Sequence, residues 1–220
     1  MLVEIDDAGT GSPVGGVVIG CRKGDTFVYE VIPPMNFHNR GVFSKEIQIQ
    51  VREIVKKLLQ KVSFNHEEDE ILICSSKIFN ETRNWLEKQN IRWKLGKVRG
   101  KTQDLVEFAF DFHLVQIGVP RLLLKRLIEY KHYVIELLKW VALDLENRSK
   151  YVKKYFKVWR NNWSKVKVIL EEGQIKKNKK YCIICGRDIK EDDKIVTIKY
   201  ITPAKVYTSM AHKECTRGLL

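Results

Sequence analysis

Two adjacent carboxylates lie beside a glycine-rich turn near the start of the chain. An apolar run over residues 2–5 predicts a buried strand, and Asp6 and Asp7 follow it directly. Four glycines and a proline occupy residues 9–16. Carboxylates at the end of a buried strand, next to backbone that can bend and be approached closely, suit a hard cation such as Mg²⁺. The alternative is a hairpin turn whose aspartates only accept hydrogen bonds from nearby amides.

A second group of residues has the spacing of a zinc site. Cys182 and Cys185 form a C-x2-C pair, and after a spacer of twenty-six residues His212 and Cys215 form H-x2-C. Thiolates and an imidazole at this spacing can converge tetrahedrally on Zn²⁺, and Gly186 suits a knuckle turn. Four protein ligands would close the site, so we expect structural zinc and a small module that depends on it to fold. The pattern resembles a treble-clef-like zinc finger.

The elements that must position the acids alternate between strand and helix patterns. The periodicity predicts an α/β domain in which a meander of three strands is followed by alternating helices and strands. The expected strands are 2–6, 14–22, 26–32, 71–74 and 91–95, and the expected helices are 43–59, 78–89 and 100–114. Ser44 is the expected N-cap of the first helix. Cys21 and Cys74 fall within strands, and we expect inert core thiols there.

The opening segment resembles a known family. Ile5-Asp-Asp-Ala-Gly-Thr-Gly11, followed by Pro13-Val-Gly and an apolar strand, is similar to the start of ribonuclease H-like domains. It is closest to the type 2 ribonucleases H, whose opening strand carries Asp-Glu-Ala-Gly-Arg-Gly; here Asp7 replaces the Glu and Thr10 replaces the Arg. The resemblance implies an α/β ribonuclease H-like mixed sheet with flanking helices. It also implies phosphodiester hydrolysis assisted by two Mg²⁺ or Mn²⁺ ions.

The same resemblance adds three acids to the candidate catalytic set of Asp6 and Asp7. Asp104 matches the aspartate that the family delivers on a late helix, and Glu107 lies one turn further along that helix. Glu46 stands near the start of the first helix, where related domains often place a glutamate. The alternatives are the solvated side of an amphipathic helix for Asp104 and Glu107, and an interaction with the helix dipole for Glu46.

One departure from the family pattern separates two functions. The strand at residues 71–74 is followed by Ser75 and Ser76, whereas the family ends this strand with a third catalytic aspartate. Serine brings no charge and binds Mg²⁺ weakly. The resemblance of the opening segment implies a metal-dependent nuclease, whereas the two serines favour the alternative, a catalytically inactive nucleic-acid-binding protein or adaptor that retains the fold.

The positive charge lies in the second half of the chain. Residues 1–119 contain 16 Lys/Arg and 16 Asp/Glu, whereas residues 120–220 contain 24 and 11, which accounts for the whole net charge of +13. Such asymmetry predicts a nucleic-acid partner (RNA, DNA or a hybrid of the two). Two long helices are expected at 121–145 and 148–172. The candidate phosphate contacts are Lys101, Lys153, Lys154, Lys157 and Arg160.

These patterns divide the chain into three parts. We expect a ribonuclease H-like domain at 1–119, a basic helical extension at 120–173 and a zinc finger at 178–220, with residues 174–180 as a basic linker. The acidic N-terminus does not resemble a signal peptide, and no apolar run is long enough to cross a bilayer. An odd number of cysteines with a metal motif fits a reduced, cytoplasmic (intracellular) setting. The oligomeric state is left open.

Overall fold

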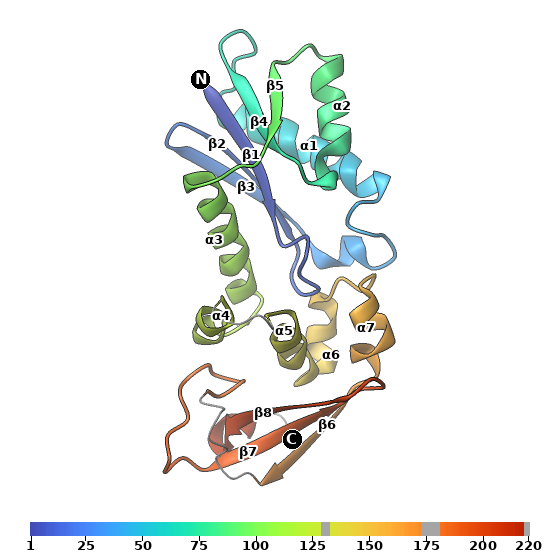
Figure 1. The fold of residues 1–220 in the computed structure, drawn as a ribbon, viewed down its shortest axis with the longest axis vertical. Helices are drawn as coiled ribbons and strands as arrows, with labels where there is room; N and C mark the ends of the chain where they lie inside the picture. The colour runs from blue at the N-terminus through green and yellow to red at the C-terminus, as the bar shows by residue number, and fades with distance from the viewer. Residues whose placement is uncertain (129–132, 173–180, 218–220) are drawn as a thin grey trace. The chain divides into compact units, whose positions relative to one another are not determined.

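The computed structural model describes residues 1–128, 133–172 and 181–217. The chain divides into two compact units, Met1–His113 and Leu114–Leu220, which are drawn in Figure 1 and are described separately below. No helix among the described residues is both long and apolar enough to cross a membrane.

The first unit contains a mixed sheet of five strands. The antiparallel meander is followed by two strands that lie parallel to β1, and the spatial order is β3-β2-β1-β4-β5. The strands are β1 (Leu2–Ala8), β2 (Val17–Lys23), β3 (Thr26–Ile32), β4 (Glu70–Cys74) and β5 (Trp93–Gly96). The expectation of an α/β fold with a mixed sheet is confirmed.

Helices cover both faces of this sheet (Figure 1). On one face lie α1 (Lys45–Lys61), α2 (Asn80–Lys88) and the single turns η1 (Pro34–Phe37) and η2 (Lys77–Phe79). On the other face lies α3 (Lys101–Gln116). The hydroxyl of Ser44 caps α1 as expected, and the residues of its apolar face are buried: Ile47, Val51, Ile54, Val55, Leu58 and Leu59.

Helix α3 packs closely on the sheet because two glycines stand beneath it. Gly20 pairs with Asp6 across β1 and β2, and a Cβ atom at Gly20 would lie 2.4 Å from Cγ2 of Val106. Gly9 has a φ of +90°, and a Cβ atom there would lie 2.4 Å from the ring of Phe110, one turn further along α3. These glycines therefore admit the side chains of a helix.

A buried polar network fixes the start of α3. Thr102 is fully buried; its hydroxyl donates to the carboxylate of Glu4 at 2.6 Å and accepts from Nε of Arg22 at 2.5 Å. Arg22 also forms an ion pair with Glu4. Because side chains alternate along a strand, Asp6 lies on the same sheet face as Glu4 and is placed beneath the following turns of α3.

The second unit combines short helices with a small antiparallel sheet. The sheet order is β6-β7-β8, formed by β6 (Lys167–Glu172), β7 (Ile195–Ile201) and β8 (Val206–His212). The helical elements are α4 (Arg121–Ile128), α5 (Tyr133–Ala142), α6 (Leu145–Arg148), η3 (Ser149–Tyr151), α7 (Lys157–Asn161), η4 (Trp163–Lys165) and η5 (Lys213–Thr216).

The prediction of a second long helix at 148–172 is wrong. This stretch contains short helical turns and then β6, which pairs with β7. Trp163 is buried, and its ring lies 5.9 Å from that of Tyr200 and 5.0 Å from that of Tyr207. Packing against the sheet therefore outweighs the helical spacing of the aromatics, and the β-branched residues that follow Trp163 favour a strand. The expected linker at 174–180 lies outside the described residues.

Gly20 provides a test of the close packing of α3. We expect Gly20→Ala to destabilise the protein by about 1–3 kcal/mol, because the added methyl group overlaps the stiff side chain of Val106. Gly11→Ala is the matched control: nothing lies within 4 Å of its Cβ position, and its unfolding free energy should stay within about 0.5 kcal/mol of wild type. Urea denaturation of both variants measures the difference, and equal stabilities would contradict the packing argument.

Two candidate metal centres

The first centre lies where β1 and β4 end side by side. Asp6, Asp7 and Cys74 each offer a donor atom, and these atoms lie within 4.8 Å of one another. Ile5 pairs with Ile73 across the parallel strands, so Asp6 and Cys74 occupy the next position of each strand. The carboxyl ends of adjacent parallel strands are a usual place for ligand binding in α/β sheets.

Asp6 is a buried acid without a counter-charge among the described residues. Only 8% of its surface is exposed, and its Oδ1 accepts a hydrogen bond from the Asp7 amide at 2.9 Å. Burial raises the pKa of Asp6, and the carboxylates of Glu107 and Glu4 raise it further. Hydrogen bonds from Cys74 and Asp7 act in the opposite direction but do not cancel the rise in pKa. A bound cation would relieve this cost of an ionised carboxylate.

Cys74 is the residue of this centre that the sequence interpretation missed. It is the last residue of β4, one position before Ser75 and Ser76, which stand where the family pattern has an aspartate. Burial raises the pKa of Cys74 to about 12, and the neighbouring carboxylates of Asp6 and Asp7 contribute to the rise. Arg83 donates to the carbonyl oxygens of Cys74 at 2.9 Å and Ser76 at 3.1 Å, which fixes this strand end. The signal in the sequence that could have identified Cys74 is that it ends a buried strand, as Asp6 and Asp7 do.

The acids of α3 differ in their relation to the centre. Glu107 acts electrostatically on Asp6 and accepts a hydrogen bond from Gln103 at 2.8 Å. Burial, followed by the charge of Glu107, raises the pKa of Asp111. Asp104 is exposed and does not belong to the cluster of donor atoms. Both Asp104 and Glu107 are therefore exposed and outside the cluster of donor atoms, and Glu107 is the one whose charge raises the pKa of Asp6.

Glu46 is placed at the start of α1 and outside the cluster. It is exposed, and hydrogen bonds with its own backbone amide and with Ser44 lower its pKa. It lines a surface hollow together with Arg40 and Gln50. This environment is that of an acid in the first turn of a helix, where the backbone amides and the helix dipole stabilise negative charge.

The second centre brings together the four residues of the Cys/His motif. Donor atoms of Cys182, Cys185, His212 and Cys215 lie within 4.8 Å of one another. In a tetrahedral site with Zn–S bonds of about 2.3 Å and Zn–N bonds of about 2.0–2.1 Å, sulfur and nitrogen lie about 3.6 Å apart. Nδ1 of His212 lies 3.5 Å from Sγ of Cys185 and 3.8 Å from Sγ of Cys215. The donor set and these distances fit a metal such as zinc.

A tight turn presents the first two cysteines. The Gly186 amide donates to the carbonyl of Cys182 at 2.8 Å, and Gly186 has a φ of +76°. A Cβ atom at Gly186 would lie 2.3 Å from the backbone nitrogen of Leu123 in α4, so this turn abuts a helix and requires glycine. Burial raises the pKa of Cys185, but hydrogen bonds from Arg187 and other groups outweigh this effect and hold the pKa at about 7. The low pKa favours the thiolate that a metal needs.

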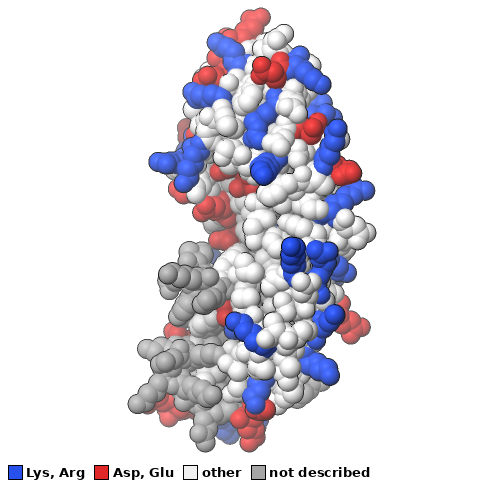
Figure 2. All heavy atoms as spheres, turned by 45° about the vertical axis from the view of Figure 1, so that its right-hand side comes forward, with Lys and Arg blue, Asp and Glu red and all other residues white. Residues whose placement is uncertain are grey.

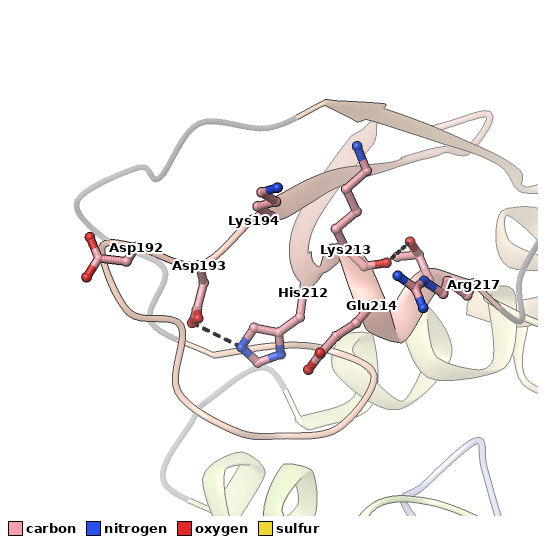
Figure 3. Close-up of a pocket in the computed structure, with 8 residues that line it drawn as sticks. Asp192, Asp193, Lys194, His212, Lys213, Glu214 and Arg217 are labelled. Atoms are coloured by element: carbon pink, nitrogen blue, oxygen red, sulfur yellow. Dashed lines mark hydrogen bonds and ion pairs between the residues drawn. The ribbon is translucent and has the colours of Figure 1, made fainter.

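The far side of the His212 ring is held in place by a loop. Nε2 lies 3.2 Å from the carbonyl oxygen of Asp188 and 3.4 Å from Oδ2 of Asp193. Asp193 points towards the ring, whereas Asp192 points away from it (Figure 3). The ring borders a hollow of about 560 Å³ lined by acidic and basic side chains. A histidine that donates one N–H to a carbonyl or carboxylate presents its other nitrogen to a metal in a fixed orientation.

The candidate nucleic-acid contacts are placed unequally. Lys153 is fully buried, so its ammonium group is inaccessible to a phosphate, and we withdraw it as a contact. Lys154, Lys157 and Arg160 are exposed. Lys101 is exposed but paired with Asp25 at 2.8 Å. Figure 2 shows Lys and Arg side chains spread over the face in view, with acidic side chains gathered at one edge of the first unit.

Cys185 provides a test of the second centre. The purified protein should retain about one equivalent of zinc, and Cys185→Ser should lose most of it because a thiolate ligand is removed. Cys21→Ala is the control: burial raises the pKa of Cys21 to about 12, and its thiol stays in the core. Elemental analysis after gel filtration gives the metal content. Equal zinc content in the Cys185→Ser variant and wild type would exclude this centre.

Asp193 provides a second, finer test. Loss of the carboxylate in Asp193→Ala should weaken zinc affinity about 10-fold, since outer partners of metal-binding histidines typically contribute 10–100-fold. Asp192→Ala removes an equal charge one position earlier and should leave the affinity unchanged. Competition with a chromophoric chelator measures both, and an equal effect of the two variants would mean that charge alone matters.

Comparison with known proteins adds no family assignment to this geometry. No protein-family model matches the chain, and no curated protein matches it significantly.

Proposed function

We propose that the protein is a divalent-metal-dependent nuclease, with a ribonuclease H-like first domain and a zinc-stabilised second unit. The observation that carries the proposal is the convergence of Asp6, Asp7 and Cys74 at the ends of two parallel strands. Asp6 is buried, its pKa is raised, and the described residues provide it with no ion pair. Such perturbed acids concentrate at functional sites.

The architecture supports this assignment. The strand order β3-β2-β1-β4-β5, with β4 and β5 parallel to β1, gives the mixed sheet that the resemblance implies. The acidic centre lies at the end of the first strand, and a late helix covers it with an acid of its own, Glu107. On this proposal Glu107, whose charge raises the pKa of Asp6, takes the place that the sequence match implied for Asp104.

The residues present fit a divalent cation. Asp6 and Asp7 would hold Mg²⁺ or Mn²⁺, and Glu107 adds negative charge nearby. A bound divalent ion supplies a polarised water nucleophile and stabilisation of the leaving oxygen. The residues themselves must give up a proton: Asp6 ionises to accept the ion, and the amide of Asp7 fixes the orientation of its Oδ1. Because Cys74 offers sulfur where related sites have oxygen, the centre should favour Mn²⁺ over Mg²⁺.

A non-catalytic nucleic-acid-binding protein is the second candidate function. It is favoured by the same Cys74, since a thiol with a pKa of about 12 brings no charge at neutral pH. The exposed position of Asp104 also leaves the centre with fewer acids than the family pattern implies. The exposed lysines of the second unit and the net charge of +13 support nucleic acid as the partner in both cases.

A calorimetric titration tests the metal centre. With zinc left in place, wild type should bind Mn²⁺ more tightly than Mg²⁺, and Asp6→Asn should lose this binding. Asp104→Asn is the control and should bind as wild type does. Mn²⁺ affinity should fall as pH is lowered into the raised pKa range of Asp6, because protons then compete with the ion. Cleavage of RNA, DNA and hybrid oligonucleotides is then measured with Mn²⁺. If the protein binds nucleic acid but does not cleave it, the nuclease is excluded and the non-catalytic nucleic-acid-binding protein is supported.

The raised pKa of Asp6 also predicts the stability of the metal-free protein. Because its pKa is raised, Asp6 holds its proton more tightly in the folded protein than in the unfolded chain. The folded protein therefore loses stability as pH rises through the raised pKa of Asp6. Asp6→Asn removes the charge and keeps an acceptor for the Asp7 amide, so it should stabilise the metal-free protein at pH 7 by about 0.5–2 kcal/mol. The gain should shrink as pH falls through the raised pKa of Asp6 and should vanish below the ordinary pKa of an aspartate. Urea denaturation at pH 7 and pH 4 measures it, and destabilisation at pH 7 would contradict the assignment.

A further inference from the structure

We infer that Lys77, Lys97 and Arg99 form the surface that holds the phosphate backbone of a nucleic-acid strand against the acidic centre. This inference rests on the proposed function and names the part of the first unit that binds its substrate. These three residues are termed the backbone-binding set.

The topology places the three cations around the acids. Lys77 comes three residues after Cys74, at the start of η2. Lys97 follows Gly96, which pairs with Cys74 across β4 and β5. The chain then reaches Thr102, which is bonded to Glu4, two residues before Asp6. The segment at 97–100 therefore crosses the same sheet face that carries Asp6, and Figure 1 shows it running from β5 past β1 to α3.

The three side chains are available to a ligand. All three are exposed, and Lys97 and Arg99 flank Val98, which is 2% exposed and anchors the segment. Within the described part of the chain, none of the three has an ion pair or a hydrogen bond. Neighbouring cations differ: Lys94 is paired with Glu70 at 2.8 Å and Lys101 with Asp25 at 2.8 Å. The described part of the chain thus leaves these three cations without a partner, and it gives the buried Asp6 no ion pair either.

The electrostatics of the centre favour such a set. Asp6, Asp7, Glu107 and Asp111 are all acids, and a phosphate that approaches them is repelled unless cations lie along the rest of the strand. Cations at the ends of β4 and β5 would bind phosphates on either side of the one at the centre. Each such contact releases counterions and steepens the salt dependence of binding, by about 0.7 per phosphate for single strands and about 0.9 for duplex DNA.

The test compares two triple variants of the full-length, zinc-loaded protein. The first replaces Lys77, Lys97 and Arg99 by Gln. The control replaces Lys57, Lys61 and Lys88, which lie in the last turns of α1 and α2, the helices that lead into the starts of β4 and β5, and which are likewise exposed and unpaired among the described residues. Both lose three positive charges. Binding of a fluorescein-labelled single-stranded RNA of about 20 nucleotides is followed by anisotropy between about 50 and 200 mM KCl, without divalent ions. A DNA strand and an RNA–DNA hybrid of the same length are tested in the same way.

The two variants should behave differently. The first should bind at least 10-fold more weakly at 100 mM KCl, and the slope of log K against log salt should fall by about 2. The control should stay within about twofold of wild type in affinity. Equal losses in both variants, or none in the first, would overturn the inference while Mn²⁺-dependent cleavage could still support the nuclease. Loss of binding in the first variant, with no cleavage by wild type, would support the surface and overturn the nuclease. Failure of wild type to bind any of the three probes would overturn both.

Discussion

The close approach of α3 to the sheet is the constraint on which the first centre depends. Gly20 and Gly9 leave room for Val106 and Phe110, and the bonds between Thr102, Glu4 and Arg22 fix the start of the helix. The same contact has two effects on Asp6. It contributes to the burial that raises the pKa of Asp6, and it brings the charge of Glu107 towards it. A looser contact would leave ordinary surface carboxylates with little reason to bind a cation.

The second unit rests on a different principle. In the part of the chain that the structure describes, its sheet has three strands, and side-chain contacts with a helix add to the stability of this sheet. Packing between α5 and the sheet supplies part of it: Lys139 is buried, bonded to Glu136 at 2.6 Å and to the Thr208 carbonyl at 3.2 Å. The Cys/His cluster supplies another part if it holds zinc, because metal binding then contributes directly to folding.

The sequence predicted the first unit well and the second unit unevenly. Alternating apolar patterns and glycine turns located all five strands of the first sheet, because local propensity and tertiary packing agree there. The spacing of Cys182, Cys185, His212 and Cys215 likewise predicted a cluster that the structure assembles. In contrast, residues 148–172 have helical spacing, but they form short helical turns followed by β6, which pairs with a strand that lies far along the chain. Lys153 was misjudged for the same reason, since its burial depends on contacts that no local pattern reveals. Cys74 was missed because a strand cysteine usually has only a packing role.

The position of β6 has a consequence for the order of events during synthesis. This strand begins at Lys167, whereas its partner β7 begins at Ile195 and the last donor of the Cys/His cluster is Cys215. The turn at Gly186 also abuts the backbone of α4, at Leu123. Leu123 and β6 therefore lack these neighbours until residues up to 201 have been synthesised, and the Cys/His cluster is complete only with Cys215. The first unit can complete its own sheet and α3 well before that point, so the ribosome delivers the two halves of the protein to folding at different times.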